Sequence, residues 1–143
     1  MKFAFLSESF IGKVGLLQET EKKADRPYIV LLAQIDDLCF AIPLRSQISH
    51  TYAFITDEAS GCGADYTKAI IITNQEDDLD NERMPHIRPN EFSALRGKEY
   101  EIERGMKRYI LMYKKAVKAP TVPRNANLIK YSTLQNYYKE LKL

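Results

Sequence analysis

The sequence has few of the residues that build disulfide frameworks and metal sites. It contains two cysteines, two histidines and no tryptophan in 143 residues. Cys39 lies in an apolar run and Cys62 lies between two glycines, which is neither the density of a disulfide framework nor the paired spacing of a zinc site. We therefore expect no metal and no cofactor, and a reducing cytoplasm is the simplest location.

Long apolar runs are also absent. The opening residues, MKFAFLSESF, turn polar at Ser7 and lack the apolar segment of a signal peptide. No later run approaches the roughly eighteen apolar residues of a membrane span. We expect a soluble, cytoplasmic protein with no membrane partner.

Length and charge set broader bounds. With 143 residues and 45% hydrophobic residues, the chain is expected to form a single domain, residues 1–143, around one core. The net charge of +2 does not by itself indicate a nucleic-acid binder. However, five acidic residues gather between Glu76 and Glu82, which leaves the rest of the surface distinctly positive.

The first half of the sequence predicts short strands. Residues 2–6 alternate in polarity, and residues 28–35 are rich in β-branched and aliphatic side chains. Asp36 and Asp37 are expected to form a turn, after which residues 38–42 return as the second arm of a hairpin that Pro43 ends. Two further strands are expected at residues 52–55 and 68–73.

The second half predicts helices. Apolar residues repeat with helical period from Glu99 to Lys118, with acidic residues at the start and lysines at the end. A short helix is expected at residues 91–95, capped by Asn90. Pro120 and Pro123 predict an extended connection, and the capping-box pattern from Ser132 predicts a last helix through Leu141. Strands followed by helices indicate an α+β domain with a small, strongly bent antiparallel sheet covered by helices.

The residues that remain for chemistry are cations and one hydroxyl near strand ends: Arg26, Arg45, Ser46, His50 and Lys68. No metal-binding spacing and no phosphate-binding glycine loop occurs. Cleavage of RNA without a metal needs a proton acceptor, a proton donor and positive groups for the charge that develops on phosphorus. Arginine, lysine and histidine can supply all three, so the inventory of residues is sufficient for this chemistry.

Each of these residues also has an ordinary structural interpretation. Arg45 and Ser46 are typical of a polar turn, and His50 of a hydrogen-bonded structural histidine. Arg26 and Lys68 are typical of solvated charges at strand ends. Taken one at a time, the structural interpretation is favoured for each residue.

The order of several segments resembles one protein family. The segments are MKFAFLSESF, RPYIVLLAQIDDLCFAIPLRSQISH, DYTKAIIIT, EYEIERGMKRYILMYKKAV and YSTLQNYYKEL. Together they are similar to the ToxN/AbiQ/TenpN toxins of type III toxin-antitoxin systems over nearly the whole chain, and most similar to the TenpN branch. The most specific element is the strand that ends in Pro43-Leu44-Arg45-Ser46.

The resemblance implies site residues. Ser46 matches the serine implicated in RNA cleavage, and Arg26 falls where ToxN has an active-site lysine. Arg45 replaces a threonine or serine of the ToxN and AbiQ branches, and an arginine can hold the scissile phosphate. The lysine that follows the serine in ToxN has no equivalent here, and we expect His50 or Lys68 to supply the proton-transfer group in its place.

The resemblance also implies a fold and a function. The fold would be a strongly curved SH3-like barrel similar to the MazF/Kid core, with added helices. The activity would be a metal-independent endoribonuclease that acts on cellular or phage RNA and leaves 2',3'-cyclic phosphate and 5'-hydroxyl ends. Its inhibitor would be a repeat-derived pseudoknot RNA antitoxin, bound in a hetero-oligomeric toxin-RNA assembly. Lys107, Lys114, Lys115 and Arg124 are the residues expected to follow the antitoxin backbone.

Two other functions stay open at the level of the sequence. The first is a non-catalytic RNA-binding or protein-binding SH3-like module. The second is a serine hydrolase, although the sequence contains no G-x-S-x-G nucleophile motif. An Ala substitution at Ser46 separates the first alternative from an enzyme, because only the enzyme would lose RNA cleavage while keeping RNA affinity.

Overall fold

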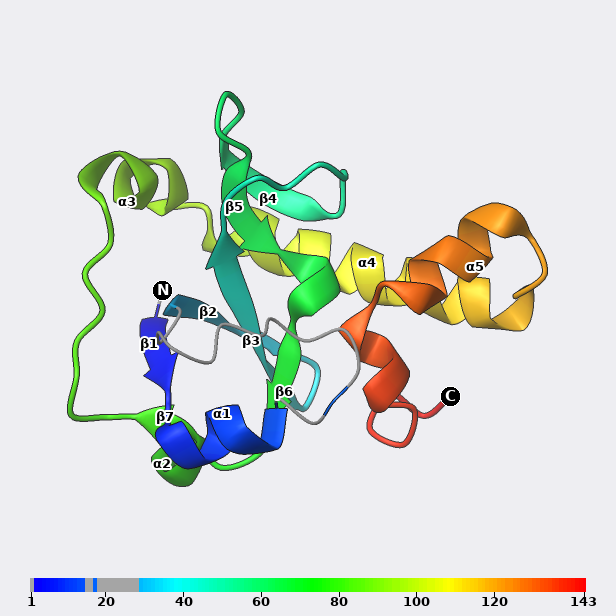
Figure 1. Cartoon of the computed structure of the whole chain (residues 1–143), viewed down its shortest axis with the longest axis horizontal. Helices are drawn as coiled ribbons and strands as arrows, with labels where there is room; N and C mark the ends of the chain where they lie inside the picture. The colour runs from blue at the N-terminus through cyan, green and yellow to red at the C-terminus, as the bar shows by residue number, and fades with distance from the viewer. Residues whose placement is uncertain (1, 15–16, 18–28) are drawn as a thin grey trace.

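The fold is α+β, as the sequence predicts. The computed structural model describes residues 2–14, 17 and 29–143. Within these residues, seven strands form one antiparallel sheet in the order β4-β5-β3-β2-β1-β7, and β6 pairs with β3 off this path (Figure 1). The strands are β1 (Lys2–Leu6), β2 (Ile29–Ile35), β3 (Leu38–Arg45), β4 (Ala53–Asp57), β5 (Cys62–Asp65), β6 (Ile70–Ile72) and β7 (Leu79–Asp80).

The β2–β3 hairpin is the centre of the sheet. Its arms pair from Ile35 opposite Leu38 to Val30 opposite Pro43. Asp36 in the connecting turn has a φ of 54°, a left-handed conformation that aspartate tolerates better than most residues. The predicted hairpin and its turn are thus confirmed over the described residues.

The prediction that Pro43 ends the second arm was wrong, because β3 continues to Arg45. On one edge β3 pairs with β6 through Ala41 and then with β5 from Leu44 onward. Neither register includes Ile42 or Pro43. Proline is tolerated at this position because the ladder on that edge is interrupted there. The continuation places Arg45 beside β5.

Strand β5 was not predicted. It pairs with both β3 and β4, and Gly63 lies opposite Arg45 on one side and Ile55 on the other. A Cβ added to Gly63 would lie 2.9 Å from the Cα of Ile55, so only glycine permits this close pairing. Because glycine has a low strand propensity and the strand is short, the sequence does not predict a strand here.

The long helix α4 (Glu99–Lys118) has the predicted bounds, and its apolar stripe from Ile102 to Ala116 is buried. The shorter helices are α1 (Glu8–Val14), α2 (Gln75–Asp78), α3 (Pro89–Leu95), α5 (Pro123–Lys130) and the 3-10 turns η1 (Tyr66–Lys68) and η2 (Thr133–Asn136). Arg88, not Asn90, occupies the N-cap position of α3, and no side chain caps that helix end.

The expected arrangement of the C-terminal segment was wrong. Pro123 begins α5 instead of an extended connection, because proline suits the first turn of a helix. Ser132 accepts a hydrogen bond from the Leu134 amide as an N-cap, but only the 3-10 turn η2 follows. The side chains of Gln135 and Asn136 donate to the carbonyls of Ser132 and Thr133 at 2.8 and 2.9 Å, and so compete with backbone donors for them.

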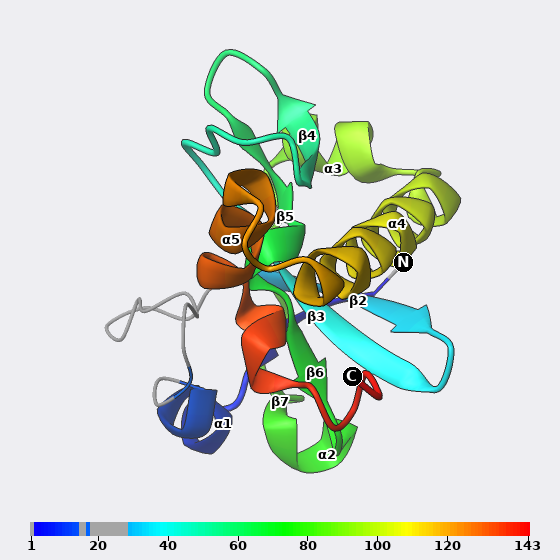
Figure 2. The same cartoon turned by 90° about the vertical axis from the view of Figure 1, so that its right-hand side faces the viewer.

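Helix α4 contacts β2 and β4, and α5 packs against α4 (Figure 2). The core between them contains Phe40, Ile42, Met106, Tyr109 and Leu134, each at most 1% exposed. The path of strands ends at β4 and β7, which do not pair with each other in the described residues. The sheet is therefore open, and the closed barrel implied by the resemblance is not seen.

Candidate functional site

Asp65 is the centre of a polar cluster with Arg45, His50 and Thr67. Its side chain, at the end of β5, is fully buried. One carboxylate oxygen, Oδ1, accepts hydrogen bonds from the Thr67 amide at 2.9 Å and from the Thr67 hydroxyl at 2.6 Å. The other, Oδ2, lies 2.6 Å from the Arg45 guanidinium. A buried carboxylate with this many donors is held as a charged group.

The register of β3 and β5 explains why Arg45 reaches Asp65. Arg45 lies opposite Gly63, and Asp65 is two residues farther along β5 on the same face of the sheet. Such diagonal neighbours are within reach of long side chains. Because Gly63 has no side chain, the arginine extends across it to the carboxylate. The Arg45 side chain keeps 29% of its surface exposed, so its charge also faces solvent.

His50 is held through both of its ring nitrogens. Nδ1 accepts a hydrogen bond from the Tyr52 amide at 3.0 Å, and Nε2 lies 3.3 Å from Oδ1 of Asp65. Because Nδ1 accepts a hydrogen bond, it carries no proton itself. The ring proton therefore belongs on Nε2, where it points to the carboxylate. The two contacts thus indicate the tautomer with its proton on Nε2.

The pKa of Asp65 is lowered from its ordinary value near 3.8. Burial acts in the opposite direction and raises it, but hydrogen bonds from His50, Thr67 and Arg45 outweigh burial. The carboxylate is therefore ionised at neutral pH, and its negative charge orients the Arg45 guanidinium.

A pocket of about 570 Å³ opens beside this cluster. Arg45, His50, Tyr52, Thr67 and Lys68 line one side of it, and Arg124, Asn127, Leu128 and Tyr131 from α5 and its end line the other. Arg45, Lys68 and Arg124 bring positive charge from three separate elements to one cavity. The arrangement suits an anionic ligand such as a phosphate group.

A second hollow, of about 700 Å³, adjoins the first, and the two share Tyr52, Arg124 and Leu128. We call it the α4–α5 groove. It lies between β4, α4 and α5, and its charged lining residues are Glu101, Arg108, Lys115 and Arg124. Together the two cavities form one depression, whose charged lining residues are five cations and one carboxylate.

The structure brings some of the predicted residues together and separates others. Arg45, His50 and Lys68 line one pocket, and Lys115 and Arg124 line the α4–α5 groove. Ser46 is exposed directly after β3 and, within the described chain, does not line the pocket. Arg26 lies outside the described residues.

Lys107 and Lys114 lie on a different face of α4 from the groove. Each is one residue away from a groove residue, Arg108 or Lys115, which is a rotation of about 100° around the helix. Lys107 lies 3.9 Å from Asp36 in the β2–β3 turn. These two lysines therefore do not share a surface with Lys115 and Arg124.

The sequence did not predict the buried Asp65 as a site residue, nor the lining residues Thr67, Glu101 and Arg108. A signal for the first two exists in the segment DYTK, because an aspartate two residues before a threonine is typical of an Asx turn. Nothing in that signal indicates that Arg45 and His50 would meet the same carboxylate. Their meeting depends on the β3–β5 register, which the sequence does not display.

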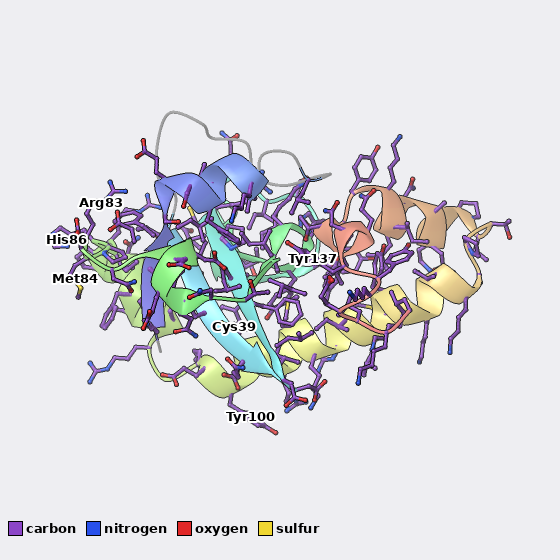
Figure 3. The ribbon with its side chains drawn as sticks, turned by 90° about the horizontal axis from the view of Figure 1, so that it is seen from below. Cys39, Arg83, Met84, His86, Tyr100 and Tyr137 are labelled. Atoms are coloured by element: carbon purple, nitrogen blue, oxygen red, sulfur yellow. The ribbon has the colours of Figure 1, made fainter. Side chains whose placement is uncertain are left out.

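The remaining histidine lies far from this site. Figure 3 shows His86 near Met84 and Arg83 at one end of the molecule, whereas α5 is at the other end. Among the described residues there is no group of three or more His, Cys, Asp or Glu placed to hold a metal. In the same part of the chain, no helix combines the length and apolar character needed to cross a membrane.

Comparisons with models of known protein families, with curated proteins and with solved structures found no match for this chain. The resemblance to the ToxN/AbiQ/TenpN toxins therefore depends on the sequence segments quoted above.

Proposed function

We propose that this protein is a metal-independent endoribonuclease whose active site is the pocket at Arg45, His50 and Lys68. The observation that carries the proposal is the buried Asp65, which holds Arg45 at 2.6 Å while Arg45 stays partly exposed at a pocket with two further cations. A positive, preorganised pocket of this kind stabilises the charge that develops on phosphorus during RNA cleavage.

In this proposal the 2'-hydroxyl of the substrate attacks the adjacent phosphorus. The bond from phosphorus to the 5'-oxygen breaks, which leaves a 2',3'-cyclic phosphate and a 5'-hydroxyl. Arg45 and Arg124 bind the non-bridging oxygens, because guanidinium groups pair well with phosphate. No covalent bond to the protein and no metal is needed.

His50 and Lys68 are the proton-transfer residues of the proposal. The Nδ1 lone pair of His50 accepts a hydrogen bond from the Tyr52 amide in the free protein. Bound RNA must displace that hydrogen bond before Nδ1 can take the 2'-hydroxyl proton. The Lys68 ammonium then gives a proton to the leaving 5'-oxygen. Asp65 positions both His50 and Arg45 without contacting RNA.

The wider function follows the resemblance. We propose a toxin of a type III toxin-antitoxin system that acts on cellular or phage RNA and is inhibited by a folded RNA antitoxin. The basic α4–α5 groove, with Arg108, Lys115 and Arg124, is the surface offered to the antitoxin backbone. A sheet core related to MazF/Kid is part of the same proposal. Ser46, exposed beside Arg45, is accessible to RNA without a change in the fold.

The test is incubation of purified protein with labelled RNA in excess EDTA, followed by identification of the product ends. Cyclic-phosphate and 5'-hydroxyl ends that appear with the protein would support the proposal. RNA that remains intact across a broad library of sequences would reject it.

A second function is favoured by a specific observation. Both ring nitrogens of His50 are engaged within the protein, and Ser46 lies outside the pocket lining of the described chain. This geometry also suits a module that binds RNA phosphates without cleaving them. Such a module would bind RNA in the same experiment and yield no new ends.

A further inference from the structure

The α4–α5 groove contains one carboxylate among its cations. The groove-lining residues of α4 are Glu101, Gly105, Arg108, Tyr109, Met112 and Lys115. Apart from Tyr109, which adjoins Arg108, they follow one another at intervals of three or four residues and so lie on one face of the helix. Glu101 is the residue nearest the start of α4, and the cations follow toward its end.

None of these charges is neutralised within the described chain. No ion pair forms there at Glu101, Arg108, Lys115 or Arg124. An acidic residue in the first turns of a helix is ordinarily explained by the helix dipole. Glu99 already places a negative charge in this first turn, and it does not line the groove. The carboxylate and the cations of the groove are thus available to a ligand that has both hydrogen-bond donors and negative charge.

The wall opposite α4 is aromatic. Tyr52 lines the groove just before β4, and Phe54 lines it two residues later on the same side of the strand. Both side chains are partly buried, and the Tyr52 ring also contacts the buried Tyr109 ring at 5.7 Å between centroids. Aromatic walls of this kind stack unpaired nucleobases.

The groove has the size and polarity for one nucleotide. A volume of about 700 Å³ lies within the usual range of small-ligand sites. Glu101 and Arg108 are two helical turns apart, or about 10 Å. That separation is close to the one between the Watson–Crick edge of a purine and its own phosphate. A nucleotide would therefore lie with its base toward Glu101 and its phosphate toward Arg108 and Arg124.

We infer that the α4–α5 groove is a base-reading subsite that selects guanine in single-stranded RNA through Glu101. Guanine alone presents two adjacent donors, N1–H and the N2 amino group, on its Watson–Crick edge, and a carboxylate accepts both. Adenine, cytosine and uracil each place an acceptor beside their donor, which a carboxylate repels. This inference depends on the proposed function, because it treats the ligand of the neighbouring pocket as RNA.

The test measures binding of four fluorescent hexamers, UUUGUU, UUUAUU, UUUCUU and UUUUUU, by anisotropy in EDTA. The hexamers carry 2'-O-methyl groups, which prevent cleavage. We expect the guanine hexamer to bind about 5- to 100-fold more tightly than the other three, the usual range for a bidentate base contact. Glu101→Ala should reduce that preference to less than about twofold by weakening UUUGUU binding, whereas UUUUUU binding should not weaken because a repelling carboxylate is removed.

Glu103→Ala is the matched control, since Glu103 is an exposed glutamate of α4 that does not line the groove. It should keep the guanine preference. Equal binding of all four hexamers by the wild type, or a guanine preference that survives Glu101→Ala, would overturn the inference and leave the proposed function standing. Failure of the wild type to bind any hexamer, together with absence of cleavage of longer RNA, would overturn both.

Discussion

The carboxylate of Asp65 lies 2.6 Å from the guanidinium of Arg45, which reaches it across Gly63, a residue of the same strand as Asp65. The aspartate is fully buried and the arginine is partly exposed, so a negative charge inside the protein fixes the direction of a positive charge at its surface. The same carboxylate faces His50 at 3.3 Å. This single buried group therefore couples the stability of the β3–β5 junction to the arrangement of the candidate site.

The first prediction concerns acid stability. The pKa of Asp65 is lowered in the folded state. The contribution of this carboxylate to the free energy of unfolding is therefore complete above the ordinary pKa near 3.8 and is lost as pH falls through the lower pKa of the folded state. Asp65→Asn should cost about 2–3 kcal/mol at neutral pH, since hydrogen bonds to a charged group are removed. The variant should also lose less stability than the wild type below about pH 4. Urea unfolding at several pH values measures both effects.

Glu103→Gln serves as the control for Asp65→Asn, because it neutralises an exposed carboxylate on α4. Its unfolding free energy should change by less than about 0.5 kcal/mol. An Asp65→Asn protein as stable as this control would show that the buried carboxylate is not structurally important.

The second prediction concerns Gly105 in α4. A Cβ at this position would lie 2.9 Å from Cζ of Tyr66, whose hydroxyl donates to the Ile102 carbonyl at 2.9 Å. Gly105→Ala should therefore destabilise the protein by about 1–3 kcal/mol, although alanine is the better helix former. Thermal unfolding measures the change.

Gly12→Ala in α1 is the matched substitution, since nothing lies within 4 Å of the added Cβ. It should be neutral or stabilising by up to about 1 kcal/mol. Equal effects at the two glycines would contradict the close approach of Tyr66 to α4.

The third prediction concerns alkaline pH. Burial raises the pKa of Tyr66 to about 12 and also raises the pKa of Tyr109, where the hydrogen bond to Ser132 opposes the effect only in part. The contribution of these tyrosines to stability should thus be complete below the ordinary tyrosine pKa of about 10 and should decline as pH rises toward 12. Ultraviolet titration should show a group of phenols that ionise late and together with unfolding. If all tyrosines ionised with the ordinary pKa while the fold persisted, the buried positions would be wrong.

The fourth prediction concerns salt. If RNA lies along Arg108, Lys115 and Arg124, the logarithm of its binding constant should fall with the logarithm of salt concentration with a slope of about −2, or about −0.7 for each phosphate contact. Lys115→Ala and Arg124→Ala should each make the slope less steep by about 0.7. Filter binding of a single-stranded RNA at several salt concentrations gives these slopes.

Lys13→Ala is the control for the salt series, because Lys13 is an exposed lysine on α1, away from α4 and α5 (Figure 1). It should leave the slope unchanged. A slope near zero in the wild type, or the same change for Lys13 as for Lys115, would contradict an RNA path through the groove.

Sequence signals predicted the helices unequally well. The bounds of α4 were predictable because its apolar period and terminal charges repeat over 20 residues. The structure of the C-terminal segment was not predictable in this way. The side-chain amides of Gln135 and Asn136 donate to backbone carbonyls there, and η2 ends after one turn. Both segments carried a sequence signal for a helix start, acidic residues in α4 and a capping box at Ser132, followed by apolar residues.

The site was predictable only in part for a related reason. Arg45, His50 and Lys68 were found as polar residues near strand ends, and they do line one pocket. Asp65, which organises two of them, was missed because its partners are 20 and 15 residues away and meet it only through the β3–β5 pairing. Strand register depends on tertiary packing, so a local pattern does not disclose it.

The central claim is that the Arg45 pocket cleaves RNA, and the most direct measurement compares cleavage and binding by wild type, Arg45→Ala, Ser46→Ala and Arg83→Ala in EDTA. Arg83 is an exposed arginine paired with Asp80 at 2.6 Å, outside the depression, and is the matched control. We predict cyclic-phosphate ends from wild type and from Arg83→Ala. Arg45→Ala should cleave at least about a hundredfold more slowly, because one charge-stabilising donor is lost. Ser46→Ala should cleave more slowly and keep its RNA affinity. Cleavage by Arg45→Ala at the wild-type rate, or RNA bound by all four proteins and cleaved by none, would contradict the account.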